Sequence, residues 1–522
     1  MKKLIFSLIF VISVLISLFY GFQKAGFHED EYYTYYSSNR SIGLYQPDRQ
    51  WQDRQTILDE FAVKPGEGFN YGLVKLVQSW DVHPPLYYFI FHTLCSFVPG
   101  KFTKWPGLIT NLIAFAIAYL FMCLLMERLK VPFTVEVLTL IFWGLGPQTV
   151  SCNMLIRMYA FLGAAVIACG YYHVRLIQDY DNNSLELKDF ILKSLVPIMV
   201  VSYIGFLIQY FYIFFFFCTG VAVAVWLVFM RKDIKAGILY VAGCAISLGL
   251  AVLTYPASLH HMFGGYRGTG ASGSFFDLAN TGMRISFFVG LLNDFVFAGG
   301  LVLIFFMIFL GLILRLTGKK AGKTGQVLPR PEIVVLTTGA IGYFLLTAKT
   351  ALLVGSASNR YEMPIYGLLI LLIFLDGYYV LSDMGNMVLI YALCAVVMAL
   401  LLKGHIYDRS ILFLYPEDAK KISYATENAD EIAVVMFNPA TPQNVWRLTD
   451  ELLCYPKVFY MDEENLERIT DKEVVSADRI ILYAADDDLQ QKAFENLLLS
   501  SNGLTIMESV SKEDMWTTYE VY

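Results

Sequence analysis

Long apolar runs without charged residues recur along most of the chain, and they indicate its fold class. The first covers residues 4–22, and later ones cover 84–99, 105–126, 137–156, 158–172, 194–230, 236–259, 295–314, 333–348, 363–375 and 384–402. A helix of about 20 apolar residues crosses the ~30 Å hydrocarbon core of a bilayer. The pattern predicts a polytopic α-helical membrane protein with about 11–13 transmembrane helices.

Two of these runs leave the number of spans open. The run 194–230 has no charged residue in 37 positions, and as one helix it would be ~55 Å long, well beyond the hydrocarbon core. We therefore expect two spans with a break near Gln209 and Tyr210. The run 84–99 is short, and counting it as a full span gives an even number of crossings. It is either half of a hairpin or a sign that another span is missed.

The pattern changes after residue 404. Short apolar stretches at 431–437, 457–460 and 479–483 are typical of buried strands, and the stretches at 444–453 and 489–499 are typical of helices. Such alternation predicts a small α/β domain. We therefore divide the chain into a transmembrane domain, 1–404, with a first extracytoplasmic loop at 23–82, and a soluble C-terminal domain, 405–522.

Composition supports this division. Hydrophobic residues make up 57% of the chain and charged residues 16%, which excludes a soluble multidomain enzyme, a disordered chain and a collagen-like fibre. Residues 405–522 carry 23 acidic and 10 basic residues, whereas residues 1–404 carry 22 acidic and 29 basic ones. The acidic tail and the absence of a basic run argue against a nucleic-acid partner.

The distribution of basic residues orients the helices. Lys2 and Lys3 precede the first run, and that run is long with no clear cleavage site after it, so we interpret it as a retained signal anchor with a cytoplasmic N-terminus. Arg128, Arg175 and Arg231 then mark cytoplasmic ends. The segments around residues 157, 210 and 360, and everything after residue 402, are expected on the outer face.

The first candidate for chemistry is His28-Glu29-Asp30-Glu31, directly after the first span. One interpretation is a solvated helix start, because acidic residues favour helix N-termini. The other is a general base at the membrane boundary, since burial and a neighbouring like charge raise the pKa of a carboxyl group.

Three further segments carry polar residues beside apolar runs. They are Asp81-Val82-His83-Pro84-Pro85-Leu86-Tyr87-Tyr88, Arg157-Met158-Tyr159 and Asn359-Arg360-Tyr361. The prolines fit a rigid helix entry, and a lone arginine at a helix end is often a snorkelling side chain. On the outer face, however, arginines are not topology signals, which favours a functional role.

Two other features receive weaker interpretations. The Gly-rich segment 260–273 is expected to be a flexible outer loop or a lid, and its adjacent histidines point apart, so they make a poor metal site. Eight cysteines without a C-x-x-C motif read as buried thiols. No metal site is evident and no cofactor is certain, although a carboxylate cluster can hold a divalent cation.

Taken together, these segments resemble the GT-C superfamily of integral-membrane glycosyltransferases, and within it the dolichyl-phosphate-mannose protein mannosyltransferase-like group with its bacterial polyprenyl-phosphate-sugar members. The resemblance rests on Asp30-Glu31 after the first span, the HPPLYY stretch ending at Tyr88, the RMY at 157–159 and the late RY at 360–361. It covers residues 1–402. Leu155 departs from it, because an acidic residue often stands there.

The resemblance implies transfer of a sugar from a polyprenyl-phosphate donor to an acceptor hydroxyl at the outer face, with inversion. Asp30 would be the general base, assisted by Glu31. The departing lipid phosphate needs cations rather than an acid, so His83, Arg157 and Arg360 would bind the donor phosphate. Further pocket residues would be His28, Asp81, Tyr87, Tyr159 and Tyr361. The acceptor, whether glycan, lipid or protein, is left open.

Two other function classes are compatible with a polytopic chain. A transporter or flippase of lipid-linked saccharides would place polar residues near the bilayer midplane and show repeated halves. Here the charges gather at the outer boundary and no repeat of their segments is found. A membrane-anchored sensor needs only one anchor, which a dozen helices exceed.

Overall fold

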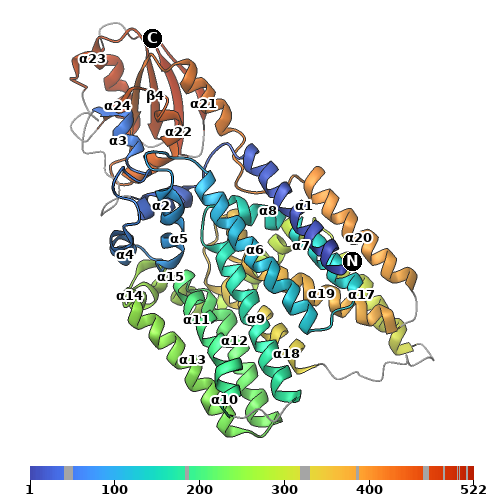
Figure 1. The fold of residues 1–522 in the computed structure, drawn as a ribbon. Helices are drawn as coiled ribbons and strands as arrows, with labels where there is room; N and C mark the ends of the chain where they lie inside the picture. Colours follow the sequence, from blue (N-terminus) through green and yellow to red (C-terminus); the bar gives the residue numbers. More distant parts are fainter. Residues whose placement is uncertain are drawn as a thin grey trace. The chain divides into compact units, whose positions relative to one another are not determined.

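The computed structural model describes residues 1–39, 51–182, 187–317, 330–383, 387–461, 469–485, 488–501, 504, 506–512 and 515–522. They form two compact units, described separately below. Unit 1 comprises Met1–Gly21, Gln78–Ile90 and Gly107–Leu412; unit 2 comprises Phe22–Val77, Phe91–Pro106 and Phe413–Tyr522. Figure 1 labels their elements. Residues 40–50 of the predicted first loop lie outside the described residues.

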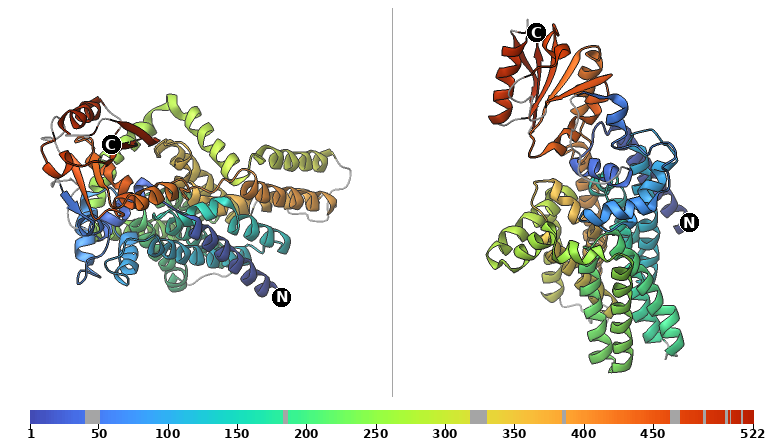
Figure 2. Two further views of the ribbon diagram at one scale, coloured as in Figure 1. Left: turned by 90° about the horizontal axis from the view of Figure 1, so that it is seen from above. Right: turned by 90° about the vertical axis from the view of Figure 1, so that its left-hand side faces the viewer.

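Unit 1 is a bundle of apolar helices, as the hydrophobic runs predict. Helices α11, α12 and α13 run side by side within it (Figure 2). The elements that carry its spans are α1 (Lys2–Gln23), α6 (Trp105–Arg128), α7 (Phe133–Gly144), α8 (Pro147–Met154), α9 (Tyr159–Asn182), α10 (Leu187–Asp189), η1 (Phe190–Leu195), α11 (Val196–Ile208), α12 (Tyr212–Val225), η2 (Trp226–Met230), α13 (Ile234–Thr254), η3 (Leu278–Asn280), α16 (Thr281–Leu291), η4 (Leu292–Val296), α17 (Leu301–Thr317), α18 (Pro331–Thr350), α19 (Met363–Asp383) and α20 (Met387–Ile406).

The described residues contain nine helices long and apolar enough to cross a membrane, or up to 11 if each of two bent helix pairs is one span. This confirms the prediction of a polytopic helical membrane protein. The predicted break in the uncharged run is also present, because α11 ends at Ile208 and Gln209 adopts an extended backbone conformation. Helix α5 (Leu86–Ser96) has only 11 residues, or ~17 Å, too short for a full span.

Helix α1 is an integral part of unit 1. Asn153 donates to the hydroxyl of Ser17 at 3.0 Å, and Tyr119 donates to the carbonyl of Phe6 at 2.8 Å. Lys2 forms an ion pair with the buried Glu136 at 2.7 Å. These contacts run along the helix from Lys2 to Ser17.

The Gly-rich segment 260–273 differs from its prediction. It is not a loop, because it forms helices α14 (Ala257–Phe263) and α15 (Tyr266–Phe276). Gly264 and Gly265 separate the two helices, and the N–H of Gly264 closes the last turn of α14 on the carbonyl of His260 at 2.7 Å. His261 is buried against Tyr210 rather than displayed on a flexible loop.

Unit 2 is built on a six-stranded sheet with the order β1-β3-β2-β4-β6-β5. The strands are β1 (Trp51–Asp53), β2 (Ile432–Met436), β3 (Lys457–Met461), β4 (Ile480–Ala485), β5 (Met507–Lys512) and β6 (Trp516–Val521). The central strands β3, β2 and β4 are parallel, and the outer pairs are antiparallel. This confirms the small α/β fold and the three strands that the apolar stretches predict.

The helices of unit 2 come from both the first loop and the C-terminal segment. Leu497 of the last helix belongs to the same apolar core as Val434, Phe459 and Leu482 of the sheet. The helices are α2 (Glu29–Asn39), α3 (Arg54–Leu58), α4 (Tyr71–Trp80), α21 (Asp418–Glu427), η6 (Pro442–Leu448), α22 (Thr449–Leu452), α23 (Lys472–Val475) and α24 (Asp488–Ser500).

The first loop and the C-terminal segment share one sheet, which the sequence did not predict. Strand β1 pairs antiparallel with β3, with Gln52 opposite Val458. The ring of Trp51 packs against Phe459 at 5.1 Å between centroids, and its indole N–H donates to Asp471 at 3.0 Å. Unit 2 therefore gathers the loop that carries Asp30 and the C-terminal domain into one folded body.

Candidate functional site

Helix α2 begins with a reciprocal pair of side-chain caps. Nδ1 of His28, the residue before the helix, accepts the backbone N–H of Asp30 at 3.0 Å. In return, Oε2 of Glu31 accepts the backbone N–H of His28 at 2.6 Å. This is a capping box with histidine in place of serine or threonine. Because Nδ1 is an acceptor here, a neutral His28 carries its proton on Nε2.

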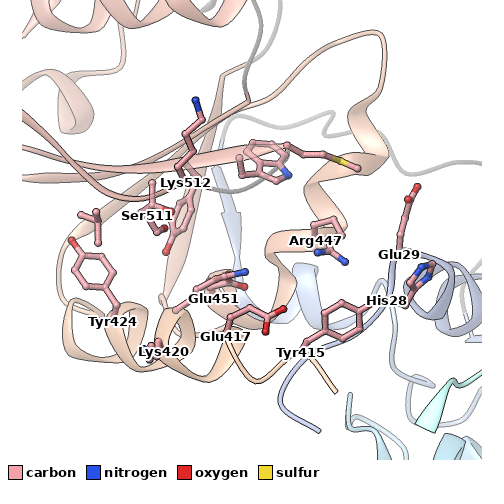
Figure 3. Close-up of a pocket in the computed structure, with 16 residues that line it drawn as sticks. His28, Glu29, Tyr415, Glu417, Lys420, Tyr424, Arg447, Glu451, Ser511 and Lys512 are labelled. Atoms are coloured by element: carbon pink, nitrogen blue, oxygen red, sulfur yellow. The ribbon is translucent and has the colours of Figure 1, made fainter. Parts of the chain in front are cut away.

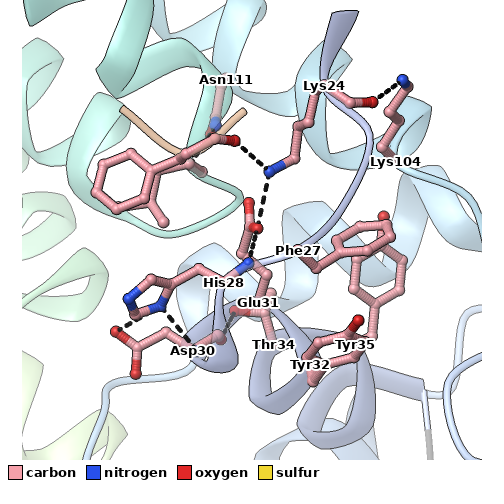
Figure 4. Close-up of polar contacts among 12 residues, drawn as sticks. Lys24, Phe27, His28, Asp30, Glu31, Tyr32, Thr34, Tyr35, Lys104 and Asn111 are labelled. Carbon is pink, nitrogen blue, oxygen red and sulfur yellow. Dashed lines mark hydrogen bonds and ion pairs between the residues drawn. The ribbon is translucent and has the colours of Figure 1, made fainter. Parts of the chain in front are cut away.

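Glu31 is held in the interior of unit 2. Its carboxylate binds Lys24 Nζ at 2.9 Å, and both side chains are 0% exposed. Lys24 also donates to the carbonyl of Phe413 at 2.8 Å (Figure 4). Burial lowers the pKa of Lys24 below its usual value, against the opposing effect of the Glu31 charge. Glu31 is thus placed to hold the start of α2.

Asp30 differs from Glu31 in its surroundings. Its carboxylate is 23% exposed, and Oδ2 lies 3.7 Å from Nδ1 of His28 (Figure 4). At the second position of a helix, the partial positive charge of the N-terminus favours a carboxylate. Of the two predicted catalytic acids, Asp30 is therefore the one that a substrate can reach.

Two acids of unit 2, the half-buried Asp450 and the buried Glu451, were not found from the sequence. Asp450 accepts the hydroxyl of Tyr32 at 3.4 Å. Burial and the charge of Asp418 raise the pKa of Asp450 to about 7, and burial and the charge of Asp450 raise that of Glu451 to about 8. Both residues lie in a stretch that reads as an ordinary polar helix, so no sequence signal marks their burial.

The predicted donor-phosphate residues His83 and Arg157 meet in unit 1. Arg157 is 4% exposed; its Nη2 donates to Nε2 of His83 at 2.7 Å and its Nη1 donates to the hydroxyl of Tyr88 at 3.2 Å. The rings of His83 and Tyr88 stack with centroids 6.4 Å apart. The HPPLYY stretch and the RMY stretch therefore form one cluster.

The direction of this hydrogen bond fixes the state of His83. A guanidinium has no acceptor, so Nε2 of His83 must accept and cannot carry a proton. His83 is neutral in this arrangement. It orients Arg157, and the positive charge of the cluster comes from the guanidinium.

Arg360 lies in η5 (Ala357–Tyr361), close to the same stretch. Its Nη1 donates to the carbonyl of Ala357 at 3.2 Å, and its guanidinium lies over the ring of Tyr361 at 4.8 Å. That ring meets the ring of Tyr159 edge-on, with centroids 5.8 Å apart. The segments that carry Arg157 and Arg360 are therefore joined through Tyr159 and Tyr361.

The other predicted pocket residues of unit 1 have different environments. Tyr87 is 0% exposed and packs against Tyr88 and Phe161, so its ring fills the core. Asp81 lies near Tyr255. The burial of Tyr255 and, as a smaller effect, the negative charge of Asp81 raise the pKa of the Tyr255 hydroxyl.

A second group of contacts in unit 1 joins Tyr210, His261 and Ser79. The sequence predicted the break at Tyr210 but not these contacts. Tyr210, at the predicted break, bonds Nδ1 of His261 at 2.9 Å, and Nε2 of His261 lies 3.2 Å from the carbonyl oxygen of Ser79. The segment that precedes Asp81 is thereby tied to the break between α11 and α12. Sequence alone gave no sign that His261 rather than His260 turns inward.

Neither unit offers an evident metal centre in the part of the chain that the structure describes. No group of three or more His, Cys, Asp or Glu side chains there is placed to hold a metal ion. The residues discussed here fall into two groups, Asp30 with its supports in unit 2 and the arginine cluster in unit 1.

Comparisons with known proteins gave structural matches only. No protein-family model matches the chain, and no curated protein does. The chain is similar to two solved structures of ArnT from Cupriavidus metallidurans. One is bound to undecaprenyl phosphate, with a TM-score of 0.45, and the other is in the apo state, with a TM-score of 0.47. Each match has 10% sequence identity and covers 98% of this chain and 97% of the other.

The buried ion pair can be tested by removing one charge and then both. Glu31→Gln keeps an oxygen for the capping box but leaves Lys24 unpaired, so we expect unfolding to become easier by ~3–5 kcal/mol. Adding Lys24→Met should recover most of this loss, because the unpaired buried charge is gone. Denaturant unfolding of the purified protein in detergent measures the loss of stability in the single variant and its recovery in the double variant. Equal instability of the single and double variants would contradict this role.

The acid pair predicts how stability depends on pH. A carboxyl group whose pKa is raised on folding contributes stability that is fully present below its unfolded pKa, 3.8 for Asp450, and is lost as pH rises through about 7. The midpoint of thermal unfolding of unit 2 should therefore fall as pH rises from about 4 to about 7. Asp450→Asn should reduce this fall, whereas Asp430→Asn, the same change at an exposed residue, should not.

Proposed function

We propose that the chain is a membrane glycosyltransferase that moves a sugar from a polyprenyl-phosphate donor to an acceptor hydroxyl. The observation that carries this proposal is the buried guanidinium of Arg157, held by the neutral His83 and by Tyr88 between two predicted spans. A buried charge in a membrane protein marks a functional site by default. A guanidinium suits phosphate oxygens, to which it can donate several hydrogen bonds at once.

The proposed leaving group explains the choice of side chains. A lipid phosphate departs as an anion and needs positive charge rather than a proton. Arg157 and Arg360 supply that charge, and His83 holds the first of them in position. An imidazolium at His83 would repel Arg157, so its neutral state suits this task. Tyr159 and Tyr361 link the two arginine segments and border the sugar.

Asp30 is the proposed general base. It would remove the proton of the acceptor hydroxyl, and that oxygen would then attack the anomeric carbon as the bond to the phosphate breaks, inverting its configuration. The proton ends on Asp30 and the electron pair on the phosphate. Two features support this assignment, namely the accessible carboxylate and its fixed place in the capping box. Glu31 assists by holding the helix start.

An odd number of spans supports catalysis at the outer face of the cell membrane. Counting each bent pair once gives up to 11 spans among the described residues, and the short α5 is not one of them. In our proposal the N-terminus is cytoplasmic, and with 11 spans Arg157, Arg360 and the C-terminal domain would then lie outside. Arg128 and Arg231 would lie inside, in agreement with the positive-inside rule.

The base assignment predicts that Asp30→Asn removes sugar transfer. A general base contributes roughly 10²–10⁴-fold to a rate, so activity should fall by at least that factor, while expression and membrane insertion stay normal. The cap survives, since it uses the backbone N–H of Asp30. The assay is transfer from a radiolabelled polyprenyl-phosphate sugar in membranes, with Asp430→Asn as control. Full activity of Asp30→Asn would disprove the assignment.

The donor-phosphate assignment predicts a different defect. Arg360→Ala should weaken use of the lipid-phosphate donor, with kcat/KM for the donor lower by about 10–100-fold, the value of a charge-assisted phosphate contact. Arg267→Ala removes an exposed arginine of α15 in the same unit and should leave the donor kinetics unchanged. Unchanged donor kinetics in Arg360→Ala would exclude that residue from the site.

A further inference from the structure

Unit 2 contains a large cavity that the catalytic proposal does not use. It has a volume of about 830 Å³ and is bordered by the start of α2, by α21, by the stretch around η6 and α22, and by strands β4, β5 and β6. Figure 3 shows His28 and Glu29 on one side of it, and Tyr424, Ser511 and Lys512 on the other. Ligand sites of this kind measure roughly 300–1,000 Å³, so the cavity has room for several sugar rings.

Aromatic rings form much of its wall. Tyr415, Tyr424, Tyr483 and Trp516 all line it. The indole N–H of Trp516 is already bonded to the carbonyl of Asn444 at 3.2 Å, and the hydroxyl of Tyr483 bonds that of Tyr455 at 3.0 Å. Trp516 and Tyr483 are each only 2% exposed, so they close the wall, whereas the half-buried Tyr415 and Tyr424 present ring surface to the cavity. Flat apolar rings beside hydroxyl groups, such as that of Ser511, suit sugars, which have C–H faces and hydroxyl edges.

Positive charge exceeds negative charge along the cavity wall. Lys420, Lys421, Arg447 and Lys512 line it, together with Glu29, Glu417 and Glu451. Burial and the charge of Asp450 raise the pKa of Glu451 to about 8, which favours its neutral form. Lys421 is paired with Asp418 at 2.6 Å. Lys420 and Lys512 are exposed side chains within reach of a bound ligand.

Arg447 is fixed in position rather than mobile. Its Nη1 donates to the carbonyl of Phe27 at 3.2 Å, and its guanidinium lies over the ring of Tyr415 at 5.6 Å. A cation held in this way loses little conformational freedom when an anion binds. The cavity is therefore preorganised for negative charge at the side where His28 lies.

We propose that this cavity binds the acceptor, and that the acceptor is an oligosaccharide carrying anionic groups. The rings of Tyr415 and Tyr424 would stack on sugar faces, and Arg447, Lys420 and Lys512 would bind phosphate or carboxylate groups. That the bound saccharide is the acceptor rests on the proposed function. His28 and Glu29 line the cavity and directly precede Asp30 in sequence, so a hydroxyl of the bound chain would reach the base.

Direct binding tests the cavity without any sugar transfer. The purified full chain in lipid nanodiscs is titrated calorimetrically with tetragalacturonic acid, with monophosphorylated maltotetraose and with unmodified maltotetraose. We expect at least one anionic probe to bind about tenfold more tightly than maltotetraose, with a preference that weakens as salt screens the lysines and Arg447. The two anionic probes distinguish carboxylate from phosphate recognition. Equal affinity for charged and neutral probes would overturn the proposal.

Charge reversal at the wall tests the location. The double variant Lys420→Glu and Lys512→Glu should weaken binding of the anionic probe by about tenfold. Because both residues are exposed, the thermal unfolding midpoint should stay unchanged. Lys472→Glu makes the same kind of change at an exposed residue of α23 that does not line the cavity, and should have no effect. Equal effects of the two reversals, or no binding of any probe, would refute the site.

The two proposals fail in distinguishable ways. Asp30→Asn should bind the anionic probe as the wild type does, since the base does not line the cavity. In the transfer assay, the double lysine variant should raise KM for the acceptor and leave kcat nearly unchanged. If the probes bind in the cavity but Asp30→Asn still transfers sugar, the base assignment is wrong and the binding site stands. If transfer occurs with an acceptor whose KM the lysines do not affect, the cavity is not the acceptor site.

Discussion

The start of helix α2 depends on the ion pair between Lys24 and Glu31, both 0% exposed. Taking two charges out of water is costly, and their attraction compensates only when hydrogen bonds satisfy the remaining donors and acceptors. Here the carbonyl of Phe413 accepts from Lys24, and the backbone of His28 donates to Glu31. The pair therefore fixes both the segment entering the helix and its first turn. The neighbouring Asp30 owes its orientation to that turn.

The functional charged groups are carboxyl groups in unit 2 and guanidinium groups in unit 1. In unit 2, carboxyl groups are divided by environment: Asp30 is accessible at a helix N-terminus, whereas burial favours the protonated form of Asp450. In unit 1, the buried guanidinium of Arg157 donates to an imidazole and a phenol, and that of Arg360 donates to a carbonyl. Such contacts fix the direction of a guanidinium that can also donate to an anion. Such an arrangement suits an anionic ligand that arrives and leaves.

The apolar runs predicted most spans, the break at Gln209 and the central strands, because these depend on local hydrophobicity. They did not predict β1, whose three residues form a strand only by pairing with β3, nor the largely exposed edge strand β5. The order of the motifs led us to expect that His83 and Arg157 lie together. It did not predict the tautomer of His83, because the tautomer depends on the hydrogen bond that Arg157 donates. The burial of Asp450 and Glu451 arises from tertiary packing, which leaves no periodic signal in the sequence.

The strand β1 has a consequence for biosynthesis. Trp51 lies 420 residues before its hydrogen-bond partner Asp471, so the first loop leaves the ribosome long before the sheet that it joins. Closing so long a loop has an entropic cost that only the completed sheet offsets. Until then, the loop with its cap residues lacks its partners, and a chain interrupted within the membrane helices cannot assemble unit 2. Unit 2 can therefore fold completely only after its C-terminal strands have been synthesised.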